Sequence, residues 1–97
     1  MTGSGQNPVV EPSVEQETQL LPQYRVILHN DDINTFEHVI LSILRLTPLN
    51  EQEAVQRTLE AHETGLSLLL MTHLERAELY VEQFASLGLT VTCEPDD

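Results

Sequence analysis

Four polar residues have types and positions that could bind a cationic group: Asn30, Asp31, Asp32 and His62. An amide carbonyl, carboxylates and a neutral imidazole nitrogen accept hydrogen bonds, and a protein α-amino group offers three donors and a positive charge. Each residue also has an explanation that needs no ligand. Asn and Asp side chains bond nearby backbone in turns, and a histidine near a helix end interacts well with the helix dipole. Residue types alone therefore leave a turn and a binding site both open.

The other histidines and the lone cysteine do not indicate a metal site or a catalytic site. No two histidines have the i, i+4 spacing of a metal-binding helix, and Cys93 has no second cysteine beside it. Ser42, Ser67 and Ser86 lie inside predicted helices and strands, and the sequence has no nucleophile-elbow motif. A histidine with two carboxylates could do acid–base chemistry, but nothing in the sequence marks a substrate cleft. We therefore expect neither an enzyme nor a bound cofactor.

The charge balance is strongly acidic. The 97 residues include 16 Asp and Glu against four Arg and no Lys, which gives a formal net charge of −12. Such a chain lacks the cations that neutralise nucleic-acid phosphates or an anionic membrane surface, and it favours a cationic partner. No stretch approaches the roughly 18 apolar residues of a membrane span. One cysteine, and no basic segment followed by an apolar one at the start, predict a cytoplasmic protein.

The sequence divides into a tail and one small domain. Residues 1–22 contain scattered Gly, Pro, Ser and Thr and no apolar period, so they cannot bury enough surface to offset the entropy lost on ordering. We expect a flexible N-terminal tail over 1–22, which is either unconstrained or engages a partner. We expect a folded domain over 23–97, with room for one layer of helices on one small sheet.

Turn and cap signals define the first elements of that domain. Residues 24–29 are rich in β-branched and aromatic side chains and predict a strand. Asn34 and Glu37 have the spacing of a capping box, which predicts the start of a first helix. Pro48 would end that helix, because proline lacks the backbone N–H that a helix interior needs.

A second helix and a second strand follow. Asn50 and Glu53 repeat the capping-box spacing, and Gly65 is the expected C-cap of this second helix. The nearly continuous apolar run 66–71 predicts a short buried strand. The region between Asn50 and residue 71 therefore adds one helix and one strand.

The last part of the chain repeats the pattern of helix and strand. Thr72 with Glu75 predicts the start of a third helix, and Gly88 predicts its end. Residues 89–93 alternate apolar and Thr side chains and predict a final strand. The expected order is strand, helix, helix, strand, helix, strand.

Four stretches of this sequence together resemble one protein family. They are residues 24–32 (YRVILHNDD), 37–40 (EHVI), 61–65 (AHETG) and 75–78 (ERAE). In this combination the chain resembles the ClpS family of Clp protease adaptors, from about Tyr24 to Glu94. The resemblance implies an α+β fold in which three helices pack on a small three-stranded antiparallel sheet, in the order β-α-α-β-α-β.

The resemblance also implies a function. Members of the family are non-enzymatic adaptors of the N-end rule. They bind substrate proteins whose free N-terminus is a bulky hydrophobic residue, an N-degron, and deliver them to a Clp AAA+ ATPase of the ClpA or ClpC kind and its peptidase. On the matching positions, Asn30 and His62 would hydrogen-bond the substrate α-amino group. Asp31 and Asp32 would support that group directly or through water.

Two further sets of residues follow from the resemblance. The side chain of the first substrate residue would enter a hydrophobic pocket formed by Phe36, Thr58, Ala61 and Leu89. The ATPase would dock on the third helix, at Glu75, Glu78 and Tyr80. The family usually continues Asn-Asp-Asp with an aromatic residue and then Thr-Pro-Met, whereas this chain continues Ile33-Asn34-Thr35-Phe36.

These departures leave an alternative function open. The chain could be a diverged ClpS-like interaction module with another N-terminal residue specificity or another unfoldase partner. For the adaptor, we expect that acetylating the amino terminus of a peptide abolishes its binding, because the charge and a donor are lost. We also expect binding to weaken as the pH falls towards about 5, because a protonated imidazole cannot accept a hydrogen bond.

Overall fold

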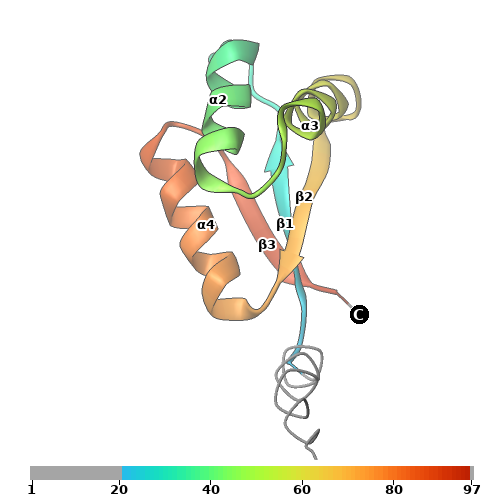
Figure 1. Cartoon of the computed structure of the whole chain (residues 1–97), viewed down its shortest axis with the longest axis vertical. Coiled ribbons are helices and arrows are strands. Elements are labelled where there is room, and N and C mark those ends of the chain that lie inside the picture. The colour runs from blue at the N-terminus through green and yellow to red at the C-terminus, as the bar shows by residue number, and fades with distance from the viewer. Residues whose placement is uncertain (1–20, 97) are drawn as a thin grey trace, which may run out of the picture.

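The computed structural model describes residues 21–96, which form a three-stranded sheet covered by three helices (Figure 1). In chain order the elements are strand β1 (Tyr24–His29), helix α2 (Phe36–Leu46), helix α3 (Glu51–Thr64), strand β2 (Leu66–Thr72), helix α4 (Leu74–Ser86) and strand β3 (Val91–Pro95). This confirms the predicted α+β fold and the order β-α-α-β-α-β. The predicted tail, 1–22, lies outside the described residues except for Leu21 and Pro22. Among residues 21–96, none of the helices has the length and apolar character that crossing a membrane requires.

Strand β1 is the centre of the sheet. The strand order is β2-β1-β3, and β1 pairs antiparallel with both neighbours. Val26, for example, lies opposite Leu70 of β2 and Cys93 of β3. The register with β2 shifts between Val26 and Ile27. Because β1 is hydrogen-bonded to a neighbouring strand along both edges, the position of its last residue, His29, is fixed. The loop that follows β1 therefore begins at a fixed position.

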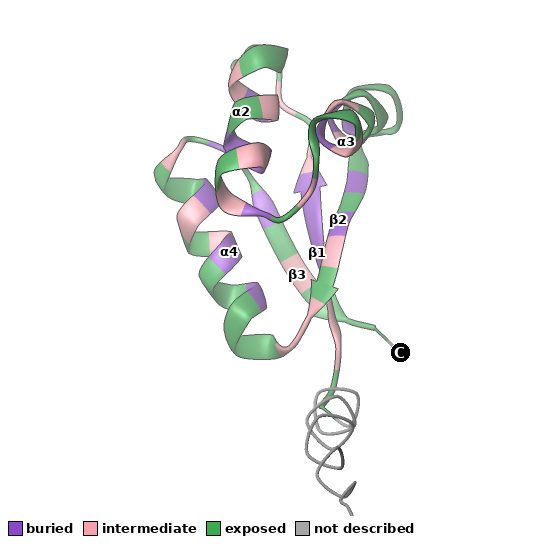
Figure 2. Cartoon of the chain, in the orientation of Figure 1, coloured by how far each residue is buried: buried purple, intermediate pink, exposed green. Residues whose placement is uncertain are grey.

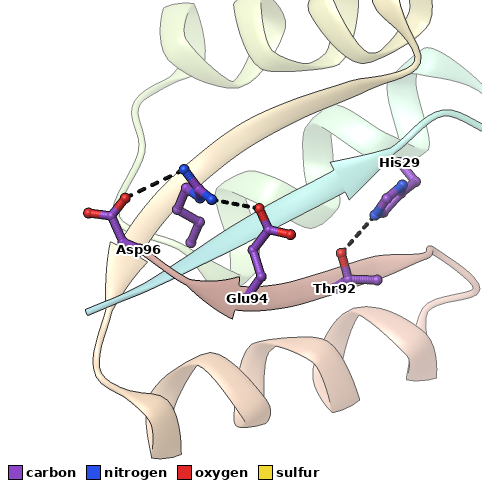
Figure 3. Close-up of polar contacts among 5 residues, drawn as sticks. His29, Thr92, Glu94 and Asp96 are labelled. Atoms are coloured by element: carbon purple, nitrogen blue, oxygen red, sulfur yellow. Dashed lines mark hydrogen bonds and ion pairs between the residues drawn. The ribbon is translucent and has the colours of Figure 1, made fainter. Parts of the chain in front are cut away.

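The outer face of β1 and β3 is polar (Figure 3). Arg25 forms ion pairs with Glu94 at 2.8 Å and with Asp96 at 3.5 Å. His29 Nε2 and Thr92 Oγ1 are 2.7 Å apart. Side chains of a strand alternate between the two faces of the sheet, so Val26 and Leu28 face the helices and belong to the core. Such exposed ion pairs add little stability, and the helix side of the sheet carries the core.

The hydrophobic core lies between the sheet and the helices, where the buried positions of Figure 2 are concentrated. Its largest fully buried apolar side chains belong to β1, α2, β2 and α4: Val26, Leu28, Ile43, Leu69 and Phe84. Each helix also contributes residues at helical spacing, as an amphipathic helix must. On α4 these are Ala77, Tyr80 and Phe84.

Helix α3 begins and ends as the sequence predicts. The side chain of Asn50 accepts from Glu53 N at 2.8 Å, and Glu53 Oε1 accepts from Asn50 N at 3.0 Å, which is a complete capping box. Gly65 is the C-cap, with a left-handed φ of 99° that favours glycine.

Helix α2 begins one residue later than predicted. Its N-cap is Thr35, whose Oγ1 accepts from His38 N at 3.1 Å. The prediction that Asn34 caps this helix was wrong. The Asn34 amide instead bonds Asp31 and Gly88, so tertiary partners outcompete the local cap.

The start of α4 and the start of β3 also differ from the prediction. Thr72 is the last residue of β2, and His73 is the N-cap of α4 without any side-chain cap bond. After α4, Leu89 N donates to Phe84 O at 3.0 Å, so Leu89 still belongs to the helix end. Strand β3 therefore begins at Val91 and not at residue 89.

Candidate functional site

Three of the four predicted acceptors, Asn30, Asp31 and Asp32, lie in the loop between β1 and α2. The backbone N–H of Asn30, the first residue after β1, donates to Gly65 O at 3.0 Å. Gly65 follows α3 directly, and His62 lies in the last turn of that helix. This single backbone bond therefore brings Asn30 next to the helix end that carries His62, although the two are far apart in sequence.

Asp31 is held in one orientation by its own loop. Its Oδ1 accepts from Ile33 N at 3.0 Å and from Asn34 N at 2.8 Å, and its Oδ2 accepts from Asn34 Nδ2 at 3.1 Å. These bonds, above all the one from the Asn34 backbone, lower the pKa of the Asp31 carboxyl below its ordinary value, against the opposing effect of burial. The charge of His38 acts in the same direction. Asp31 is thus a fixed negative charge.

This lowered pKa predicts an acid-dependent contribution to stability. A carboxyl whose pKa is lower in the folded state stabilises the fold above its unfolded pKa, and that contribution is lost as the pH falls through the folded pKa. We expect Asp31→Asn to lower the free energy of unfolding by about 1 kcal/mol near neutral pH, the scale of one net hydrogen bond. The difference from wild type should shrink at a second, acidic pH well below 3.8, the ordinary pKa of this carboxyl, where Asp31 becomes protonated. Urea unfolding at both pH values measures it, and an equal difference at both would contradict the role of the ionised carboxylate.

A small cavity opens beside this loop. Its volume is about 20 Å³, which is room for about one water molecule. It is lined by residues of β1, the loop, α2 and α3: Leu28, His29, Asn30, Asp31, Asn34, Phe36, Val39, Thr58 and Ala61. Of the predicted site residues, the structure brings Asn30, Asp31, Phe36, Thr58 and Ala61 together here. Leu28, His29, Asn34 and Val39 also line the cavity but were not predicted as site residues. The inward periodicity of β1 and α2 could have indicated Leu28 and Val39.

Phe36 and His62 meet at the edge of this cavity. Their rings are in edge-to-face contact, with centroids 5.0 Å apart and an interplanar angle of 74°. His62 is exposed, and Phe36 is 43% exposed although it lines the cavity. The Phe36 ring therefore lies between the cavity and solvent, next to the predicted acceptor His62.

Asp32 and Leu89 lie apart from the cavity lining. Asp32 is exposed in the loop, where its carboxylate adds negative charge beside Asp31. Leu89 is buried in the core and is not one of the residues that line the cavity.

The predicted docking residues lie on α4. Glu75 and Glu78 are exposed. Tyr80 is 4% exposed and belongs to the core, with the Arg76 guanidinium 5.7 Å from its ring centroid. The surface of α4 therefore presents the two carboxylates and not the tyrosine.

This arrangement can bind a cation with directed donors. Asn30 and the fixed Asp31 carboxylate line a small cavity with apolar walls, and the His62 imidazole lies beside it against Phe36. Such acceptors suit an ammonium group. Within the described residues, no three His, Cys, Asp or Glu side chains cluster as metal ligands would. The geometry is that of a binding site with a polar rim.

Comparison with known protein families identifies the family of this chain. The sequence model of the family described as ATP-dependent Clp protease adaptor protein ClpS matches residues 19–92, which include almost all of the folded part. The chain belongs to the ClpS family. It is accordingly an adaptor of the Clp protease and not an enzyme.

Relatives in bacteria and chloroplasts match over most of the chain. The ClpS adapter of Synechococcus elongatus is 39% identical over 90 residues, which cover 92% of this chain and 95% of the relative. The chloroplastic adapter CLPS1 of Chlamydomonas reinhardtii is 39% identical over 83 residues, which cover 84% of this chain and 51% of that longer protein.

A solved structure shares the fold of this ClpS chain. It is ClpS2 of Agrobacterium tumefaciens bound to L-phenylalaninamide, with a TM-score of 0.74 and 25% sequence identity. The match covers 77% of this chain and 98% of the Agrobacterium chain. That ligand is a single amino acid with a free α-amino group, an aromatic side chain and an amide in place of the next peptide bond.

Proposed function

We propose that this ClpS protein binds the free N-terminus of substrate proteins at the loop of residues 30–32 and the end of α3, and delivers them to a Clp ATPase. The observation that carries the proposal is the Asn30 N–Gly65 O bond, which places the loop acceptors beside the helix end of His62. The binding of L-phenylalaninamide by the Agrobacterium relative supports it, because that ligand has the chemistry of an N-terminal residue.

Each acceptor has a distinct role in this proposal. The Asn30 side-chain carbonyl and a neutral His62 nitrogen accept two of the three α-ammonium N–H groups. Asp31 and Asp32 supply negative charge, with Asp31 held by its bonds to Ile33 and Asn34. Hydrogen bonds between charged and neutral partners are stronger than neutral pairs, so the set discriminates an α-ammonium from a blocked terminus.

The hydrophobic pocket is proposed to open only when a substrate enters. A cavity of about 20 Å³ holds about one water molecule, and a bulky first side chain needs more room. Phe36 is the wall that can give this room, because its ring is partly exposed and not fixed in the core. Thr58 and Ala61 form the opposite wall from α3.

A series of peptides that differ only in the first residue tests this function. We expect Leu-, Phe-, Tyr- and Trp-headed peptides to bind and Gly- or Glu-headed peptides to bind at least about tenfold more weakly, since apolar side-chain differences give roughly 10- to 200-fold discrimination. In Phe36→Ala the aromatic-headed peptides should gain affinity relative to the Leu-headed peptide. Fluorescence anisotropy measures both, and Leu41→Ala, an exposed residue on α2, is the control. Affinities that do not depend on the first residue would refute the function.

The partner is proposed to be a ClpA- or ClpC-like AAA+ ATPase. Its contact surface on this adaptor would include Glu75 and Glu78 on the exposed side of α4. We further propose that residues 23–97 are the adaptor domain, preceded by a tail over 1–22. The cytoplasm is the proposed location, because Cys93 is free and a reducing compartment keeps thiols in that state.

A further inference from the structure

The Asn34 side chain joins two loops that are distant in sequence. Its Nδ2 donates to Asp31 Oδ2 at 3.1 Å and to Gly88 O at 2.9 Å. An amide nitrogen has two N–H groups, and both are used here. Asn34 therefore ties the carboxylate of the site to the connection between α4 and β3, which Figure 1 shows beside α2.

A second side chain makes a parallel link. His38 Nε2 lies 2.8 Å from Leu87 O. A carbonyl oxygen can only accept, so Nε2 carries the proton in this contact. His38 and Asn34 thus bond two consecutive carbonyls, Leu87 and Gly88, from one side.

The Leu87 and Gly88 carbonyls lie in a turn that is held by its own hydrogen bonds. The carbonyl of a C-cap residue has no partner within its helix, and His38 supplies one for Leu87 O. Asn34 bonds the next carbonyl, Gly88 O, in the turn that follows α4. In this turn, Leu87 N and Leu89 N both donate to Phe84 O at 3.0 Å. Gly88 completes the turn with a φ of 83°, which favours glycine.

We propose that Asn34 and His38 form a brace that holds Asp31 in the orientation that an α-ammonium group requires. The two residues are positioning residues that act through Asp31. Asn34 also lines the cavity, but both of its N–H groups are already bonded to Asp31 and Gly88. The inference rests on the proposed function, since it concerns how one acceptor of that site is aimed.

The brace acts on the oxygen that the loop backbone leaves free. Backbone N–H groups of Ile33 and Asn34 occupy Oδ1 of Asp31, whereas within residues 21–96 Oδ2 receives a hydrogen bond from the Asn34 side chain only. A carboxylate oxygen can accept more than one hydrogen bond, so Oδ2 can still accept from a ligand. Without the Asn34 amide, Asp31 would keep its backbone bonds but lose the link through Asn34 to Gly88, in the connection between α4 and β3.

A double-mutant cycle on peptide affinity tests the brace, because it isolates coupling between two residues. We expect Asn34→Ala to weaken binding of a Phe-headed peptide about five- to tenfold in the wild-type background. In the Asp31→Ala background the same change should cost less than about twofold, since the residue through which it acts is gone. Gln52→Ala, an exposed amide on α3, should cost nothing in either background.

A second test of the brace uses His38, for which a conservative substitution is expected to restore binding. His38→Ala should weaken binding about threefold, and His38→Gln, which keeps an N–H donor, should restore most of it. Melting temperatures of all variants identify any that fail to fold. The brace would be overturned if Asn34→Ala weakened binding equally in both backgrounds. It would also be overturned if Asn34→Ala had no effect in the wild-type background while Asp31→Ala did weaken binding. Either result would leave the proposed function standing. No loss from Asp31→Ala itself would overturn both the brace and the proposed role of Asp31.

Discussion

A variant in which both Asn30 and His62 are replaced with alanine is expected to bind a peptide with a free amino terminus at least about 100-fold more weakly than wild type. Each substitution removes one acceptor of a charged donor, and such hydrogen bonds contribute about 1.5–3 kcal/mol. Two of them correspond to about 3–6 kcal/mol, and each 1.4 kcal/mol is a tenfold change in affinity. Fluorescence anisotropy of a labelled Leu- or Phe-headed peptide measures the loss.

The fold should tolerate this double substitution. Both residues are exposed, and the bond that joins the loop to α3 uses the backbone of Asn30 and not its side chain. The matched control is Gln52→Ala with His73→Ala, which also removes one amide and one imidazole, at positions outside both the cavity lining and the Phe36–His62 ring contact. A tenfold loss in the control, or none in the Asn30 and His62 variant, would show that these side chains do not form the acceptor set.

Phe84→Ala is expected to lower the free energy of unfolding by about 3–5 kcal/mol, the usual cost of truncating a buried Phe. The Phe84 side chain is 0% exposed and is one of the largest in the core. Its backbone carbonyl also accepts two bonds that close the end of α4. For a domain of this size, 1 kcal/mol shifts the melting temperature by about 4–8 °C, so circular dichroism should show a melting temperature lower by about 12–40 °C.

Leu79→Ala is the control for the core substitution. It removes a large apolar side chain from the same helix, but Leu79 is 46% exposed. Its cost should stay below about 1 kcal/mol. Similar costs for the two variants would mean that α4 packs on the sheet with a different face.

Local signals predicted those parts of the fold that depend on neighbouring residues alone. The capping box of Asn50 and Glu53 and the left-handed Gly65 need only residues within α3 and its end, and both are as predicted. Asn34 and Glu37 have the same capping-box spacing, but the Asn34 side-chain amide donates to Asp31 and Gly88 instead. Because Gly88 is 54 residues away in sequence, no local pattern could reveal that competition.

The candidate site was predictable in its residue types but not in its shape. A resemblance of short motifs pointed to Asn30, Asp31 and His62, and the sheet and the Asn30 N–Gly65 O bond bring their segments together. The small volume of the cavity depends on where the Phe36 ring lies, which side-chain packing decides. Likewise, the burial of Tyr80 follows from the helical phase of α4, in which it shares a face with Phe84.

The most direct test of the central claim compares two peptides of identical sequence, one with a free amino terminus and one acetylated, by calorimetric titration into the wild-type protein. Both peptides present the same bulky first side chain, so only the charge and donors of the α-amino group differ. The acceptors of the proposed site would be left unpaired by the acetylated peptide, and sites of this kind reject such ligands strongly. We predict measurable binding of the free peptide and at least about 100-fold weaker binding of the acetylated one. Equal affinities would contradict the claim that this protein recognises the N-terminus of its substrates.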